Sequence, residues 1–151
     1  MKTLARPADL EDVRRRIRTL RSDRSAVWGR MSVHQMVCHL SDGCRMATGE
    51  LPVEPLVLRM PALRKAVALW VPLPWPAGLP TSPEIDQHAR GTPSGAFGTD
   101  VAVLLDLVEQ VASAPPALDG HPHPVFGRMS KAAWLRWAYL HLDHHLRQFG
   151  A

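Results

Sequence analysis

The stretch that decides the fold is WLRWAYLHLDHHLRQF, residues 134–149. Its apolar residues and its histidines recur with the period of an α-helix. At 4-3-4-3 spacing stand Trp134, Ala138, His141, His145 and Gln148. Residues at this spacing share one face of a helix. The face that buries a tryptophan therefore also presents two histidines.

His141 and His145 are four residues apart, a spacing that brings two Cβ atoms on a helix to about 5–6 Å of each other. Their imidazoles can therefore converge on one metal ion. Two ligands rarely hold an ion tightly, so a third is expected from another helix. The alternative is that both are ordinary histidines of a packed helix, because H-x-x-x-H is a short and common pattern.

His39 is the best-placed third ligand. The segment 32–49 is predicted to be a helix that Ser32 caps and Gly49 ends. One of its two neighbouring apolar stripes consists of Met36, His39, Gly43 and Met46. Gly43, one turn from His39, leaves room for another backbone or a ligand. Against this interpretation, a lone histidine on an apolar face is more often a hydrogen-bonded core residue than a ligand.

The whole pattern predicts an all-α fold. Further helices are expected at 8–21, from 61 to about 71, and from Thr99 or Asp100 to Pro115. No repeat and no strand-like run occurs, so we expect a four-helix bundle with a short extra helix, formed by residues 1–151 as one domain. The connection 50–98 is long enough to cross the bundle, which allows the helices on either side of it to run parallel. The sequence does not predict the rest of its structure.

The composition indicates a globular cytoplasmic protein. Hydrophobic residues make up 46% of the 151 residues, which excludes a disordered chain. Cys38 and Cys44 lie six apart in one predicted helix, a poor geometry for a mutual disulfide, so reduced thiols are expected. The first seven residues lack the apolar core of a secretory signal. Charged residues and prolines within 56–75 exclude a membrane span there.

The net charge of +4 raises the question of nucleic-acid binding. The positive charge clusters only at 14–18, and Glu11, Asp12 and Asp23 flank this cluster. We interpret it as the solvated face of an amphipathic helix and expect no nucleic-acid partner. The rival hypothesis predicts a salt-dependent affinity for DNA.

The other histidines have weaker claims to a metal. On a helix, His144 is rotated by about 60° from His141 and by about 100° from His145, so we expect it behind the ligands or at the surface. His34 lies about 140° around the helix from His39 and faces elsewhere. Three more histidines fall in predicted loops: His88, His121 and His123. Of these, the last two remain less favoured alternatives as ligands.

Several polar residues near the histidines have two interpretations each. They are Gln35, Gln148, Asp42 and Asp143. The amides could orient an imidazole or a substrate, and the carboxylates could accept a hydrogen bond from a ligand imidazole. All four could equally be groups on a helix surface. The two cysteines are not favoured as ligands beside so many histidines.

Three segments together resemble the DinB/YfiT-like superfamily, and most closely a branch of it catalogued only as a domain of unknown function. They are QMVCHL at 35–40, HPVFG at 123–127 and HLDHHLRQFG at 141–150. The resemblance implies an up-down-down-up four-helix bundle in which three histidines hold a divalent metal. One ligand comes from the second helix and two come from H-x-x-x-H in the last. By position these are His39, His141 and His145.

The resemblance also implies a chemistry. Some members are transferases or isomerases that use bacillithiol, mycothiol or glutathione, and others are described as metal-dependent hydrolases. This chain departs from the common H-H-R-G-Q ending, so a thiol cosubstrate rests on relatives alone. We expect zinc, nickel or iron(II), a small-molecule substrate, and either an enzyme or a non-catalytic metal-binding or sensing module. The protein could form a homodimer. No catalytic residue is assigned. The residues suggested for the lining of a substrate pocket are Met36, Trp75 and Phe126.

Overall fold

The computed structural model describes residues 1–56 and 59–151, and residues 57 and 58, inside the long connection, lie outside this description. The helices are α1 (Pro7–Arg18), α2 (Val33–Thr48), α3 (Pro61–Trp70), α4 (Phe97–Ala112), the short 3-10 helix η1 (Pro116–Leu118) and α5 (Lys131–Gln148). A small antiparallel sheet is formed by β1 (Pro122–His123) and β2 (Gly127–Arg128). None of the helices in the described ranges is long and apolar enough to cross a membrane. The expected all-α class is therefore confirmed, with a small sheet added.

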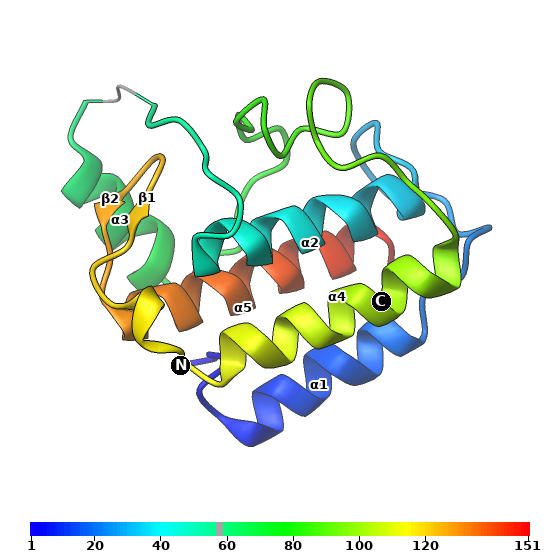
Figure 1. Cartoon of the computed structure of the whole chain (residues 1–151), viewed down its shortest axis with the longest axis horizontal. Coiled ribbons are helices and arrows are strands. Elements are labelled where there is room, and N and C mark those ends of the chain that lie inside the picture. Colours follow the sequence, from blue (N-terminus) through cyan, green and yellow to red (C-terminus); the bar gives the residue numbers. More distant parts are fainter. Residues whose placement is uncertain (57–58) are drawn as a thin grey trace.

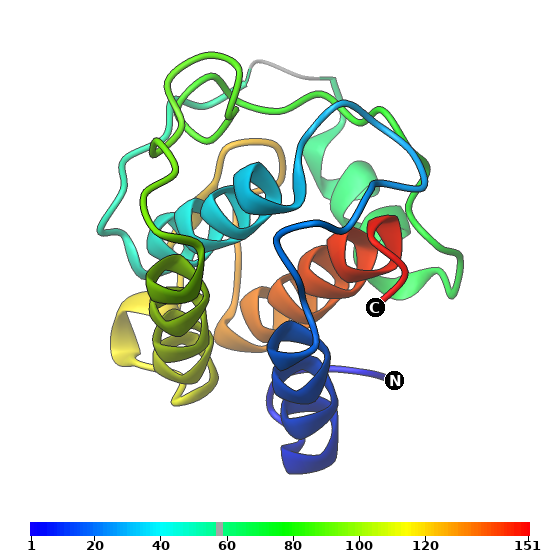
Figure 2. The same cartoon turned by 90° about the vertical axis from the view of Figure 1, so that its right-hand side faces the viewer.

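The long helices α1, α2, α4 and α5 pack side by side. α2 lies against both α4 and α5, and α1 lies against the same two helices (Figure 1). The sequence colours in Figure 1 progress in one direction along α2 and α4 and in the other along α1 and α5. α3 packs on α5 from outside this group (Figure 2). As a result, α5 is covered on several sides, and its buried face meets α2.

α2 has the start and the end that the sequence predicts. Ser32 Oγ accepts from the Gln35 backbone N–H at 3.1 Å, and Gln35 Oε1 accepts from the Ser32 backbone N–H at 2.9 Å. This reciprocal pair is a capping box, which satisfies two free donors at a helix start. Gly49 ends the helix with a φ of 81°, a conformation that glycine adopts without steric cost. Gln35 therefore serves the helix start and not the histidines.

The core joins the predicted apolar stripes of different helices. The fully buried side chains include Val37 and Leu40 of α2, Leu104 and Val108 of α4, and Trp134 and Leu142 of α5. Burial of such side chains is the main favourable term in folding. It also fixes the rotation of α2 and α5 about their axes. The direction of every other side chain on these helices follows from that rotation.

The start of α4 differs from the prediction that Thr99 or Asp100 caps it. The helix begins at Phe97, after Ala96, and no side chain caps it. Asp100 instead lies in the first turn, where its carboxylate accepts from the Gly95 backbone N–H at 2.8 Å. An acidic residue in the first turn is favoured by the helix dipole. The helix thus begins about one turn earlier than predicted, and Asp100 lies inside its first turn and not at the cap.

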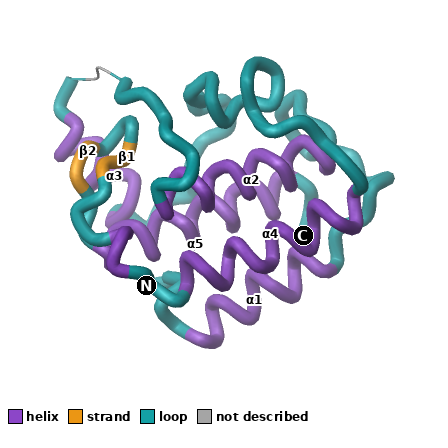
Figure 3. Tube along the Cα trace, in the orientation of Figure 1, coloured by secondary structure: helices purple, strands orange, loops and turns teal. Residues whose placement is uncertain are grey.

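The small sheet was not predicted. Pro122 pairs with Arg128 and His123 with Gly127, so the hairpin lies directly before α5. Strands of two residues carry no alternation of apolar and polar positions, which is the signal that identifies a strand in a sequence. The hairpin turns His123 into the interior, where it is buried. The rest of the described chain between the helices is loop, and much of it gathers along α2 (Figure 3).

Candidate metal centre

The histidines His39, His141 and His145 come together between α2 and α5. Each contributes one ring nitrogen to a group whose atoms all lie within 4.8 Å of one another. The Nε2 atoms of His39 and His141 are 3.0 Å apart. His39 and His141 are buried, and His145 is partly buried. The structure therefore brings together the residues that the sequence singled out.

A backbone carbonyl determines which ring nitrogen of His39 carries the hydrogen. Its Nδ1 lies 2.8 Å from the carbonyl oxygen of Ile85, in the long connection. A carbonyl oxygen only accepts, so this nitrogen carries the hydrogen and donates it. In the neutral ring the Nε2 atom then has a free lone pair, which faces His141. Hydrogen bonds of this kind orient histidine ligands in metal sites.

A glutamine fixes His145 in the same manner. Gln148 Nε2 donates to the Trp28 carbonyl oxygen at 2.7 Å, which orients the amide. Its Oε1 then faces His145 Nδ1 at 2.8 Å and accepts a hydrogen bond from it. The His145 Nε2 atom is left with a lone pair. Of the two interpretations of Gln148, the structure supports the one in which it orients an imidazole.

His141 lies in a slot between an indole and a glycine. Its ring stacks on Trp137 with 4.7 Å between the centroids and 21° between the planes. A Cβ atom at Gly43 would lie 2.9 Å from His141 Cε1 and 3.1 Å from its Nδ1. Real Cβ atoms do not approach a ring this closely, so only glycine leaves the imidazole its place. The room that the sequence predicts beside Gly43 is filled by a histidine ring.

The three imidazoles are neutral at physiological pH. Burial lowers the pKa of His39, and it lowers the pKa of His145 to about 3. Burial also holds the pKa of His141 well below its ordinary value, and the neighbouring histidines lower it further. A metal binds the neutral imidazole, not the imidazolium. The cluster is therefore in the protonation state that a cation needs.

Asp42 fastens the long connection to α2, one turn after His39. This carboxylate is fully buried. It accepts from the Thr92 backbone N–H at 2.9 Å, from the Thr92 hydroxyl at 2.6 Å and from Gln87 Nε2 at 3.1 Å. These bonds hold the segment that also presents the Ile85 carbonyl to His39. Asp42 is thus neither a surface group nor a direct partner of an imidazole, and it supports the site through the loop.

The remaining candidates lie outside the cluster. His144 is buried, and its ring centroid is 5.9 Å from that of Trp28 and 6.2 Å from that of Trp75. It therefore lies in the interior beside the cluster, with its ring centroid 4.9 Å from that of His145, and not at the surface. Asp143 pairs with Arg16 at 2.8 Å and with Arg147 at 2.9 Å and does not reach an imidazole.

A second group of metal-ligating residue types joins α2 to α4. It contains His34, Cys38 and Asp100. His34 Nε2 lies 2.7 Å from Asp100 Oδ2, and Cys38 Sγ lies 3.8 Å from the same oxygen. Burial raises the pKa of the Cys38 thiol, so it stays protonated. We interpret this group as a hydrogen-bonded brace, and it confirms that His34 faces away from His39.

His123 is a buried histidine whose role the sequence does not reveal. Its Nδ1 accepts from the Val125 backbone N–H at 3.1 Å, and its buried Nε2 has no partner among the described residues. Its ring stacks on Phe126, with 4.5 Å between the centroids, and lies 5.1 Å from the ring of Trp137. Burial lowers its pKa to about 3. One indole therefore separates this neutral ring from His141.

Fold and site together define a helical protein with a buried cluster of three neutral histidines. The chain from residue 3 to residue 151 matches the family described as "Protein of unknown function (DUF1569)", and it belongs to that family. This confirms the expectation of a domain of unknown function. No curated protein and no solved structure matches the chain.

A single methyl group at Gly43 tests the packing of the site. Because the new Cβ would displace the His141 ring, we expect Gly43→Ala to weaken metal binding about ten- to hundredfold, as changes beside a ligand do. Gly98→Ala is the matched control, since a Cβ there meets nothing within 4 Å. The measurement is a competition titration against a chromophoric chelator. Equal affinity of the two variants would contradict the slot described for His141.

His123 makes folding stability depend on pH. Its pKa is about 3 in the fold, against an ordinary value of 6.5. Between these values the unfolded chain binds a proton that the folded chain does not, so the free energy of unfolding falls as pH drops. His123→Gln removes up to one proton from the difference in proton binding between the unfolded and folded chains. We therefore expect the slope of the free energy of unfolding against pH to fall by up to about 1.4 kcal/mol per pH unit between pH 4 and 6.

Urea unfolding of chelator-treated protein at several pH values provides the measurement. The exposed His88 supplies the control, because His88→Gln removes a histidine that the fold does not bury. The free energy of unfolding of His88→Gln should change with pH as steeply as that of the unmodified chain. The same slope in His123→Gln would show that His123 does not contribute to the acid sensitivity.

Proposed function

We propose that this chain binds one divalent metal ion through His39, His141 and His145. The observation that carries the proposal is the pair of hydrogen bonds from ring Nδ1 atoms, one to the Ile85 carbonyl and one to Gln148. They turn the lone pairs of His39 and His145 toward a common point. The ring nitrogens of the three histidines also lie within 4.8 Å of one another, a convergence that a metal ion can use.

We further infer membership of the DinB/YfiT-like superfamily and its up-down-down-up four-helix bundle, with residues 1–151 as one domain. The directions of the four long helices in Figure 1 support this order. So does the origin of the ligands, with one in the second long helix and two in the last. The family of unknown function to which the chain belongs would then be a branch of this superfamily.

The ligand set suits catalysis. Three protein ligands leave a position for water or a substrate, whereas structural zinc sites close with four. Imidazoles suit zinc, nickel and iron(II) alike. A bound ion of this kind can polarise a substrate oxygen or lower the pKa of a bound water or thiol. The chain's own residues orient the ligands, through Ile85 and Gln148, and shield them from water, through Trp137.

The reaction class we propose is that of a thiol-dependent S-transferase or isomerase, or of a hydrolase, acting on a small molecule. A low-molecular-weight thiol would be the cosubstrate in the first case. A cytoplasmic setting is in keeping with the free thiols of Cys38 and Cys44. A homodimer is the assembly we propose to test first.

Nucleic acid is not part of this proposal. The basic cluster 14–18 is largely neutralised within the fold, by ion pairs that join Arg14 to Glu109, Arg15 to Asp12, Arg16 to Asp143 and Arg18 to Glu11. A phosphate backbone is bound by basic groups that can release counterions. Arginines already paired with carboxylates have less to offer it.

The second candidate function is a non-catalytic metal-binding or sensing module. The burial of His39 and His141 favours it, as does the loop that Asp42 holds over α2. A site closed in this way would hold an ion without admitting a substrate. The two candidates share the ligands and differ in access.

Metal titration tests the ligand set. Protein purified without a histidine tag and treated with chelator should bind one equivalent of zinc, nickel or iron(II). His141→Ala and His145→Ala should each abolish tight binding, because two imidazoles rarely hold an ion. His144→Ala is the matched control on the same helix and should bind as before. The proposal would be refuted if the protein bound no metal and gained no thermal stability when metal was added.

Cobalt(II) separates the two functions and the two ligand groups. Cobalt held only by imidazoles lacks the near-ultraviolet band of a thiolate ligand, so Cys38→Ser should leave the spectrum unchanged. If the site is open, adding glutathione should produce a thiolate band and change the visible spectrum. A spectrum that glutathione leaves unaltered would argue against the thiol-dependent class, and a spectrum that azide, a small anionic ligand, also leaves unaltered would favour the non-catalytic module.

A further inference from the structure

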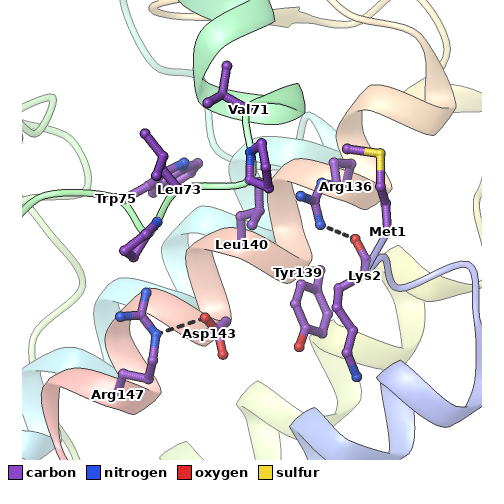
Figure 4. Close-up of a pocket in the computed structure, with 12 residues that line it drawn as sticks. Met1, Lys2, Val71, Leu73, Trp75, Arg136, Tyr139, Leu140, Asp143 and Arg147 are labelled. Carbon is purple, nitrogen blue, oxygen red and sulfur yellow. Dashed lines mark hydrogen bonds and ion pairs between the residues drawn. The ribbon is translucent and has the colours of Figure 1, made fainter.

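We propose that a cavity on the outer side of α5 binds a small carboxylate with an apolar body. The cavity measures about 490 Å³ and lies between the first two residues of the chain, the segment 71–75 after α3, and α5 (Figure 4). Pockets for small molecules commonly have 300–1,000 Å³, so a ligand of this kind fits.

Arg136 gives the cavity a buried positive charge. This residue is only 7% exposed, and it lines the cavity. Its Nε donates to the Leu69 carbonyl oxygen at 3.0 Å, and its Nη1 donates to the Lys2 carbonyl oxygen. Within the described ranges, no carboxylate lies close enough to form an ion pair with it. A buried charge without a counterion is costly, and a bound anion would reduce that cost.

The other charged groups around the cavity already have partners. Lys2 Nζ lies 2.9 Å from Asp9 Oδ1, so these two neutralise each other. Asp143 is paired with Arg16 and Arg147, and Arg16 also lies 3.7 Å from Asp12, so these two arginines have carboxylate partners too. The carboxylates near the cavity are therefore already paired, and among the described residues Arg136 is left without a carboxylate partner. A guanidinium suits a carboxylate because it can donate two parallel hydrogen bonds.

The walls facing this charge are apolar. Val71, Leu73, Trp75 and Leu140 line the cavity. Leu73 is 70% exposed, so covering it would remove apolar surface from water. Trp75 Nε1 donates to the Ala68 carbonyl oxygen at 2.9 Å, which holds its ring in the wall. An apolar wall beside an unpaired guanidinium fits a ligand with a carboxylate at one end and a hydrocarbon or aromatic body.

This site is independent of the metal. None of the three clustered histidines lines the cavity. Arg136 and Leu140 lie on a different face of α5 from His141 and His145, because successive helix residues are rotated by about 100°. Trp75 is the element common to both regions, since its ring centroid is 6.4 Å from that of His141. Because no clustered histidine lines the cavity, binding should occur with or without metal.

Calorimetric titration of the chelator-treated full chain with octanoate tests the proposal. We expect one octanoate per chain. Octanol, which has the apolar body without the charge, should bind at least roughly tenfold more weakly, a difference of about 1.4 kcal/mol. Inorganic phosphate, which has charge without the body, should bind more weakly than octanoate as well.

Two substitutions at Leu73 test the apolar wall without touching the core. Leu73→Glu should weaken octanoate binding by at least roughly tenfold, because it puts a charge where the hydrocarbon body is expected to lie, whereas the neutral Leu73→Gln should change it much less. Arg136→Gln should also lose binding, and if it fails to fold the Leu73 pair still decides. No octanoate binding, equal binding of octanoate and octanol, phosphate binding as tight as octanoate, or equal effects of the two Leu73 substitutions would each overturn the proposal.

Discussion

The hydrogen bond from His39 Nδ1 to the Ile85 carbonyl is the constraint on which the site depends. It joins the central helix to the long connection, 46 positions away in sequence, and it decides which nitrogen of His39 faces α5. The connection could not present that carbonyl if it moved freely. Asp42 prevents this, because its buried carboxylate binds Thr92 and Gln87 further along the same loop. These hydrogen bonds anchor the loop from Ile85 to Thr92 to α2, although the loop forms no helix or strand.

Helical periodicity predicted the long helices and singled out the three histidines as candidates, while leaving open that they were ordinary core residues. The stripe that contains Trp134 and Ala138 predicted an inward direction for His141 and His145, and Ser32 was predicted correctly as the residue that caps α2. Helix faces and helix caps depend on residues close together in the chain, so the spacing of residues in the sequence predicts them. The superfamily resemblance selected His39 independently.

The supporting contacts could not be predicted in the same way. Asp42 and Thr92 are 50 positions apart, and Gln148 bonds to the Trp28 carbonyl across 120 positions. No periodicity links such residues, since loops approach helices through turns that have no repeat. The hairpin around His123 was missed for a related reason, because its strands are too short to alternate. Sequence identified which residues could bind a metal, and the structure identified what holds them.

The contact between His39 and His141 shows why Gly43 matters. Two ring nitrogens 3.0 Å apart can share one proton, or their lone pairs can face one cation. Since His39 Nδ1 donates to Ile85, the shared proton must belong to His141 Nε2. A cation would take its place, and the neutral His141 would then carry its hydrogen on Nδ1. That atom lies beside Gly43, where any Cβ would come within 3.1 Å of it. The missing side chain therefore leaves room for the tautomer that a metal requires.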